Sequence, residues 1–80
     1  MHELGVLRQA VKTVSRIAEQ HQIQRIKHIT LEVGTESTFV PHYLEKLFPV
    51  ATDQVSLMKG AELRIRMVPG ERLVIGEIGY

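Results

Sequence analysis

Residues 26–34 read IKHITLEVG, and this stretch decides which fold the rest of the chain can build. Its apolar side chains fall at every second position, at Ile29, Leu31 and Val33. Because side chains alternate between the two faces of a strand, all three point to the same side. The sequence therefore predicts a half-buried strand that ends at Gly34 and needs a cover for its apolar face.

The segment before this strand has the period of a helix. Apolar residues recur at spacings of three and four, at Leu4, Leu7, Val11, Val14 and Ala18. This pattern predicts an amphipathic helix from Glu3 to His21, with its apolar stripe facing the core. Glu3 lies in the first turn, where a carboxylate suits the positive end of the helix dipole.

A second helix is predicted after the turn-rich loop TESTF, residues 35–39. Pro41 suits the first turn of a helix, and Ser37 or Thr38 is the expected cap. The expected buried face of this helix consists of Val40, Leu44, Leu47 and Ala51.

Pro49 falls inside the pattern of the second helix. Proline has no backbone N–H and its ring crowds the preceding turn, so we expect the helix to kink or break near residues 46–48. A shorter helical piece is then expected over residues 50–56.

Two further strands are predicted near the end of the chain. Residues 61–68, AELRIRMV, alternate apolar and charged side chains, and residues 72–78, RLVIGEI, form a second apolar run. The tetrapeptide VPGE between them suits a type II turn, with Pro69 and Gly70 at its centre. The sequence therefore predicts a C-terminal β-hairpin over Leu63–Ile78.

The predicted order α-β-α-β-β describes an α+β fold. The simplest burial of both helix stripes is one three-stranded sheet with the two helices on one face. The other face of the sheet and its edges would then remain exposed. A homodimer would cover them.

Composition narrows the classes of function. The 80 residues are expected to form a single domain, 1–80, and the net charge of +1 gives no basic excess for nucleic acid. No apolar run approaches the ~20 residues that span a bilayer, so no membrane partner is expected. The chain has no cysteine. This excludes disulfides, thiolate zinc sites and cysteine nucleophiles, and it fits a cytoplasmic location.

The first three residues, Met1-His2-Glu3, place several metal-binding atoms together. The terminal amine of Met1 with the amide and imidazole of His2 would form fused chelate rings, and the Glu3 amide or carboxylate could complete the set. Nitrogen-rich, planar ligation suits Ni(II) or Cu(II) better than Zn(II). The amine and the imidazole must be deprotonated to bind, so affinity should fall in acid.

The other polar residues favour structural roles. His21 suits a helix C-terminus, and His28 and His42 are expected to be solvated. Arg64 and Arg66 share one strand face that is expected to face water, although an acidic partner would also fit it. No acid, base and nucleophile share a motif, so an enzyme is not expected.

Five ordered segments resemble the HypA/HybF family, the nickel chaperones of nickel-iron hydrogenase maturation. They are MHEL, ITLEVG, ESTFVPHYLEKLF, GAELRIRMVP and GERLVIGEI, and together they extend over nearly the whole chain. The resemblance implies that Ni(II) is held by the Met1 amine, the His2 imidazole and amide, and the Glu3 amide or side chain. It also implies a maturation GTPase or the large subunit of a nickel enzyme as partner.

The chain departs from the family pattern at Pro69 and Gly70. Family members carry a zinc module with two Cys-x-x-Cys pairs between the Val-Pro dipeptide and the last strand, whereas here Pro69 runs directly into Gly70. No zinc is therefore expected. An alternative function is that of a zinc-less paralogue, a protein-interaction or regulatory module that dimerises without delivering metal.

Overall fold

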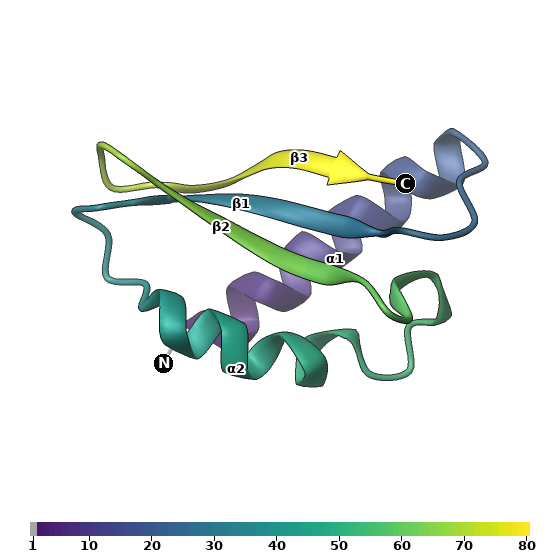
Figure 1. The fold of residues 1–80 in the computed structure, drawn as a ribbon, viewed down its shortest axis with the longest axis horizontal. Coiled ribbons are helices and arrows are strands. Elements are labelled where there is room, and N and C mark those ends of the chain that lie inside the picture. The colour runs from purple at the N-terminus through teal and green to yellow at the C-terminus, as the bar shows by residue number, and fades with distance from the viewer. Residues whose placement is uncertain (1) are drawn as a thin grey trace.

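The computed structural model describes residues 2–80 (Figure 1). Their order is α-β-α-β-β, as predicted. The elements are α1 (Glu3–Gln20), β1 (His28–Gly34), α2 (Pro41–Thr52), a 3-10 turn (Ser56–Met58), β2 (Glu62–Val68) and β3 (Leu73–Gly79). None of the helices described is long and apolar enough to cross a membrane.

The strands form one sheet in the order β2-β1-β3, so the predicted C-terminal hairpin is wrong. β1 lies between the other two strands, parallel to β2 and antiparallel to β3. The physical reason lies in β1 itself, whose apolar side chains all point to the face that the helices cover and which is the most deeply buried of the three strands. Its Ile29, Leu31 and Val33 are at most 1% exposed, whereas all residues of β2 and β3 are half-buried or exposed.

The connection between β2 and β3 crosses the end of β1 instead of closing a hairpin. The backbone N–H of Gly34 donates to Arg72 and that of Glu36 donates to Gly70, at 2.7 and 2.9 Å. A Cβ on Gly34 would overlap the Gly70 carbonyl, so glycine is required where the crossing segment touches β1.

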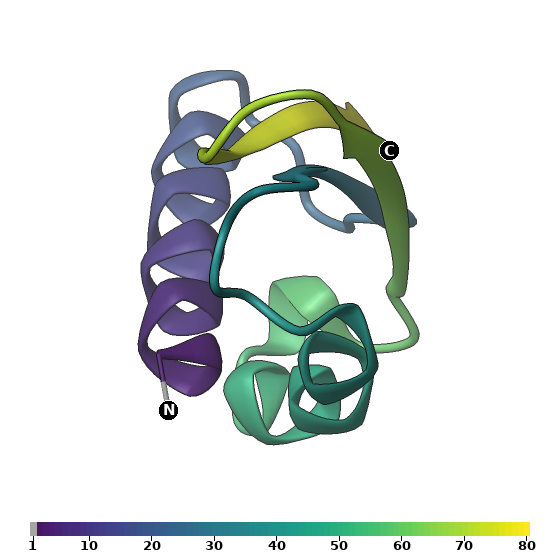
Figure 2. The ribbon, with the colours of Figure 1, turned by 90° about the vertical axis from the view of Figure 1, so that its left-hand side faces the viewer.

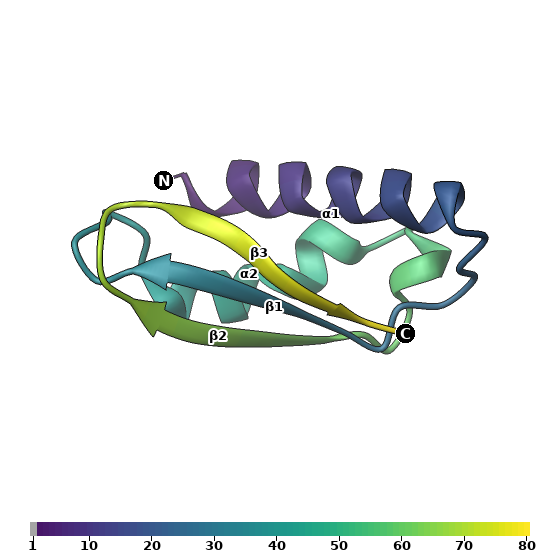
Figure 3. The ribbon, with the colours of Figure 1, turned by 90° about the horizontal axis from the view of Figure 1, so that it is seen from above.

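Both helices lie against the same face of the sheet, as Figure 2 shows in end view and Figure 3 from above. The predicted stripe of α1 is buried, except that Leu4 is only half-buried. Within residues 2–80, thirteen buried apolar residues form one core, and α1 and α2 also pack against each other.

The predicted break at Pro49 is wrong, because α2 continues through it to Thr52. Proline removes one backbone hydrogen bond, whereas Leu44, Phe48 and Ala51 all hold the helix against the core. Val40, predicted to be buried, is 40% exposed and precedes the first turn.

Candidate metal centre at the N-terminus

His2 stands at the start of α1 with its side chain exposed to solvent. Its carbonyl accepts the Val6 backbone N–H at 2.9 Å, which closes the first turn of the helix and fixes the backbone of His2. Met1 lies outside the described residues, so the amine of the predicted chelate is not placed.

The imidazole of His2 packs against Phe39, which belongs to the loop before α2. The two rings meet edge to face, with centroids 6.1 Å apart and an interplanar angle of 78°. This arrangement is the favoured one for aromatic rings. The contact gives the ring a neighbour while leaving it accessible to a metal ion.

Glu3 differs from His2 because the fold buries it, with 3% of the residue exposed. Its Oε2 accepts the backbone N–H of Val40 at 3.0 Å. This hydrogen bond lowers the pKa of Glu3, and a second bond from its own backbone N–H lowers it further. The carboxylate therefore ties the first turn of α1 to the start of α2.

This contact also corrects the predicted cap of α2. No side chain of Ser37 or Thr38 caps the helix, which begins after Val40 without a side-chain cap bond. The Ser37 hydroxyl donates instead to the Gly34 carbonyl at 2.7 Å. The acceptor near the start of α2 comes from Glu3, 37 residues away in the sequence, and short-range patterns carry no signal for such a partner.

The remaining histidines divide into two exposed residues and one half-buried residue. His21 ends α1 as predicted, and His42 is exposed in the first turn of α2. The prediction that His28 is solvated is wrong, because only 17% of its side chain is exposed. Within residues 2–80 its Nε2 is buried without a hydrogen-bond partner, and the nearest carboxylate oxygen, Oε1 of Glu77, is 3.8 Å away.

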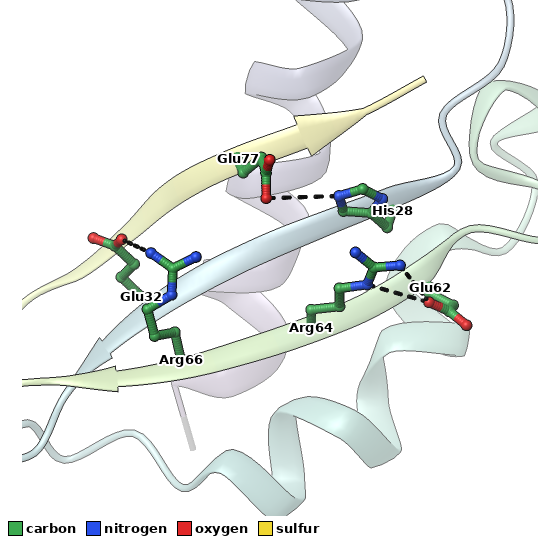
Figure 4. A network of polar contacts seen from close by, with 6 residues as sticks. All are labelled: His28, Glu32, Glu62, Arg64, Arg66 and Glu77. Carbon is green, nitrogen blue, oxygen red and sulfur yellow. Dashed lines mark hydrogen bonds and ion pairs between the residues drawn. The ribbon is translucent and has the colours of Figure 1, made fainter.

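The face of the sheet opposite the helices carries a band of charged side chains (Figure 4). Arg66 on β2 donates to Glu32 on β1 at 2.9 Å, and Arg64 contacts Glu62 of its own strand at 3.3 Å. The acidic partner considered for the arginine pair therefore lies within the chain itself.

The described residues hold no second candidate metal site. Across residues 2–80, no group of three or more His, Asp or Glu side chains gathers closely enough to bind a metal ion. Any site of the predicted kind would depend on the N-terminal segment, where backbone and amine atoms supplement the side chains.

Comparison with known proteins adds a family to this geometry. The family described as "Hydrogenase/urease nickel incorporation, metallochaperone, hypA" matches residues 1–73. The chain belongs to the HypA family. The predicted family is thereby confirmed, and the match includes the N-terminal segment with His2 and Glu3.

Individual HypA-family proteins agree with this placement. The hydrogenase maturation factor HypA of Trichodesmium erythraeum is 40% identical over 70 residues, which cover 88% of this chain and 58% of that protein. HybF of Salmonella typhimurium is 34% identical over 71 residues, covering 89% and 62%. The chain thus spans about three fifths of the length of these relatives.

A solved structure confirms the fold. The solution structure of the Ni metallochaperone HypA from Helicobacter pylori superimposes with a TM-score of 0.78 at 14% identity, covering 96% of this chain and 88% of that one. The α+β arrangement of two helices and a three-stranded sheet is therefore that of HypA.

Proposed function

We propose that this chain binds Ni(II) at Met1-His2-Glu3 and delivers it during the maturation of a nickel enzyme such as hydrogenase. The observation that carries the proposal is the arrangement at the start of α1, where the His2 ring is open to solvent while Glu3 anchors the turn below it. Membership of a nickel-incorporation family supports the choice of metal.

The chemistry is ligand binding and exchange. His2 supplies its imidazole and its backbone amide, and Met1 supplies the terminal amine. Nitrogen donors of this kind favour Ni(II) in a planar or tetragonal arrangement. The carboxylate of Glu3 already accepts from Val40 and from the Glu3 backbone N–H, so binding of nickel by the Glu3 amide would replace the second of these bonds, and its other oxygen is the alternative ligand.

Delivery requires a partner that takes the ion from an exposed site. A maturation GTPase or the large subunit of the nickel enzyme would approach α1, whose first turn carries the ligands. An exposed chelate with few side-chain ligands allows such a partner to add its own ligands before the first ones leave. The chain would act in the cytoplasm and would catalyse no reaction of its own.

Nickel titration by calorimetry tests the site. Wild-type protein that begins at Met1 should bind one Ni(II), and His2→Ala should weaken binding by at least about 100-fold. His21→Ala is the matched control, since His21 is also exposed but lies at the other end of α1. Equal nickel binding by wild type and His2→Ala would refute the proposal.

A second variant isolates the terminal amine. Adding two residues before Met1 keeps every side chain but moves the amine away from His2. We expect nickel affinity to fall nearly as far as in His2→Ala. Unchanged affinity would mean that the amine is not a ligand.

Metal analysis of the purified protein tests the proposal that the chain holds no zinc. The single domain 1–80 contains no thiolate to hold that ion. We expect metal analysis after purification to find no stoichiometric zinc, and a tightly held zinc ion would contradict this.

A further inference from the structure

The sheet has two outer edges that no strand in residues 2–80 covers, and they differ in regularity. The pairing of β3 with β1 shifts register between Thr30 and Leu31, and β3 contains Gly76 and Gly79. β2 pairs with β1 in unbroken register over seven residues, without glycine or proline. A regular, uncovered edge is a template for another strand, whereas bulges and glycines blunt an edge.

The backbone of β2 shows which residues would pair. Glu62 donates its N–H to Lys27 on the β1 side, and the Val68 carbonyl accepts from Thr35 on that side. Because successive residues of a strand alternate, the even-numbered residues direct their polar groups towards β1. Leu63, Ile65 and Met67 therefore direct their N–H and C=O groups away from the sheet.

The side chains of Leu63, Ile65 and Met67 point towards the helices, but the helices cover them only in part. Met67 is 47% exposed, and Leu63 and Ile65 are half-buried. α2 is the helix that contacts β2, and it exposes Tyr43 and Val50. These two lie seven residues apart and share a helix face. An added strand would bury apolar surface that the single chain leaves in water.

We propose that β2 pairs antiparallel with β2 of a second copy, about a two-fold axis at Arg64, to form a six-stranded sheet. The charge pattern and the length of the strand favour this register, since an axis at Leu63 would also pair Glu62 with an arginine but would leave only residues 62–64 of each strand opposite one another. With the axis at Arg64, Glu62 lies opposite the partner's Arg66, and the symmetry repeats this ion pair. A shift of one residue, to an axis at Ile65, would place Arg64 opposite the partner's Arg66 twice, which like charges disfavour.

This axis places Arg64 opposite Arg64 of the second copy, which is an unfavourable pair of like charges. Glu62 offsets it on each strand, because it contacts Arg64 at 3.3 Å. All three charged side chains of β2 stand on the outward face of the sheet (Figure 4), so they would meet their counterparts in water while the apolar side chains meet on the other face.

Sedimentation analysis over a range of concentrations tests the proposal, with Glu62→Arg and Arg66→Glu as paired variants. The wild type should form dimers at high concentration. Each variant alone should dimerise at least about tenfold more weakly. In each, the side chains at positions 62 and 66 have the same charge, so the two copies would repel each other where these positions meet. An equimolar mixture of the two variants should recover dimers, because one carries Arg at both positions and the other Glu. Arg16→Glu, on the exposed side of α1, is the charge-reversal control.

Ile65→Pro provides a variant independent of charge. Because the Ile65 N–H points away from β1 and would lie opposite Leu63 of the second copy, proline there removes a donor from the free edge and spares the ladder to β1. We expect a folded monomer, with the fold checked by circular dichroism. A wild type that stays monomeric at every concentration overturns the proposal. So does a dimer that these edge variants leave unchanged, because it would use another surface. Nickel titration is read separately and decides neither outcome.

Discussion

His2 and His28 present the same side chain to opposite environments. The His2 ring is exposed at the start of α1, with Phe39 against its edge. The His28 ring lies across β3, where a Cβ on Gly79 would overlap it, and its Nε2 is buried without a hydrogen-bond partner within residues 2–80.

The difference shows that the packing around a histidine decides whether its ring can bind a metal ion. A ligand must have an open lone pair and space for the ion and its other donors. His2 has both, whereas Nε2 of His28 is shielded by its neighbours. His28 instead fills the space above a glycine and contributes to the sheet. The comparison predicts that His2 serves the proposed nickel site and that His28 contributes to stability.

The largest expected effect on stability comes from Gly79→Ala. The new methyl group would overlap the His28 ring, which must leave its position on β3. Overpacking of this kind costs about 1–3 kcal/mol, and urea denaturation should show a loss near the upper end. Nickel affinity should not change.

The double variant Gly79→Ala/His28→Ala is the control for that mechanism. Removing the ring makes room for the methyl group, so the double variant should lose less stability than the sum of the two single variants. Additive losses would show that the strain comes from the β3 backbone and not from the ring.

His28→Ala and His2→Ala together test the comparison directly. We expect His28→Ala to lose about 1–2 kcal/mol of unfolding free energy with unchanged nickel binding. The loss is moderate because removing the ring also removes a buried nitrogen without a partner. His2→Ala should show the reverse, with weakened nickel binding and an unchanged denaturation midpoint. Nickel loss in both variants would contradict the division of roles.

The sequence predicted the elements of this fold better than their pairing. Periodicity located α1 and all three strands, because helix and strand periods are local properties. It could not show that β1 separates β2 from β3, since a four-residue connection between two strands usually indicates a hairpin. The burial of His28 and the bond from Val40 to Glu3 depend on strand order and helix packing, so no local pattern could reveal them.

Glu3→Gln should lower stability by a smaller amount and make the loss depend on pH. The bond from Val40 lowers the pKa of Glu3 below its ordinary value of 4.5 in the folded chain. The contribution of the carboxylate is therefore fully present above that ordinary value and is lost as pH falls through the lowered one. Thermal unfolding should show a wild type a few degrees more stable than Glu3→Gln at neutral pH, with the difference shrinking in acid.

His42→Gln is the matched control for that measurement, because His42 is exposed in the first turn of the same helix α2. It should not reproduce the shrinking difference below pH 4.5. A gap between wild type and Glu3→Gln that stays constant through the acid range would mean that the carboxylate charge is not what holds α1 to α2.

The smallest expected effect is that of Arg66→Ala on the outward face of the sheet. Arg66 contacts Glu32 at 2.9 Å, but more than half of the arginine side chain is exposed. Exposed ion pairs contribute about 0.2–1 kcal/mol, so the variant should lose no more than this in urea denaturation of dilute protein. Added salt should reduce the difference, because it screens exposed charges. A loss as large as that of His28→Ala would contradict the comparison, since it would make the exposed charged residues of the sheet as important to stability as the half-buried His28 ring.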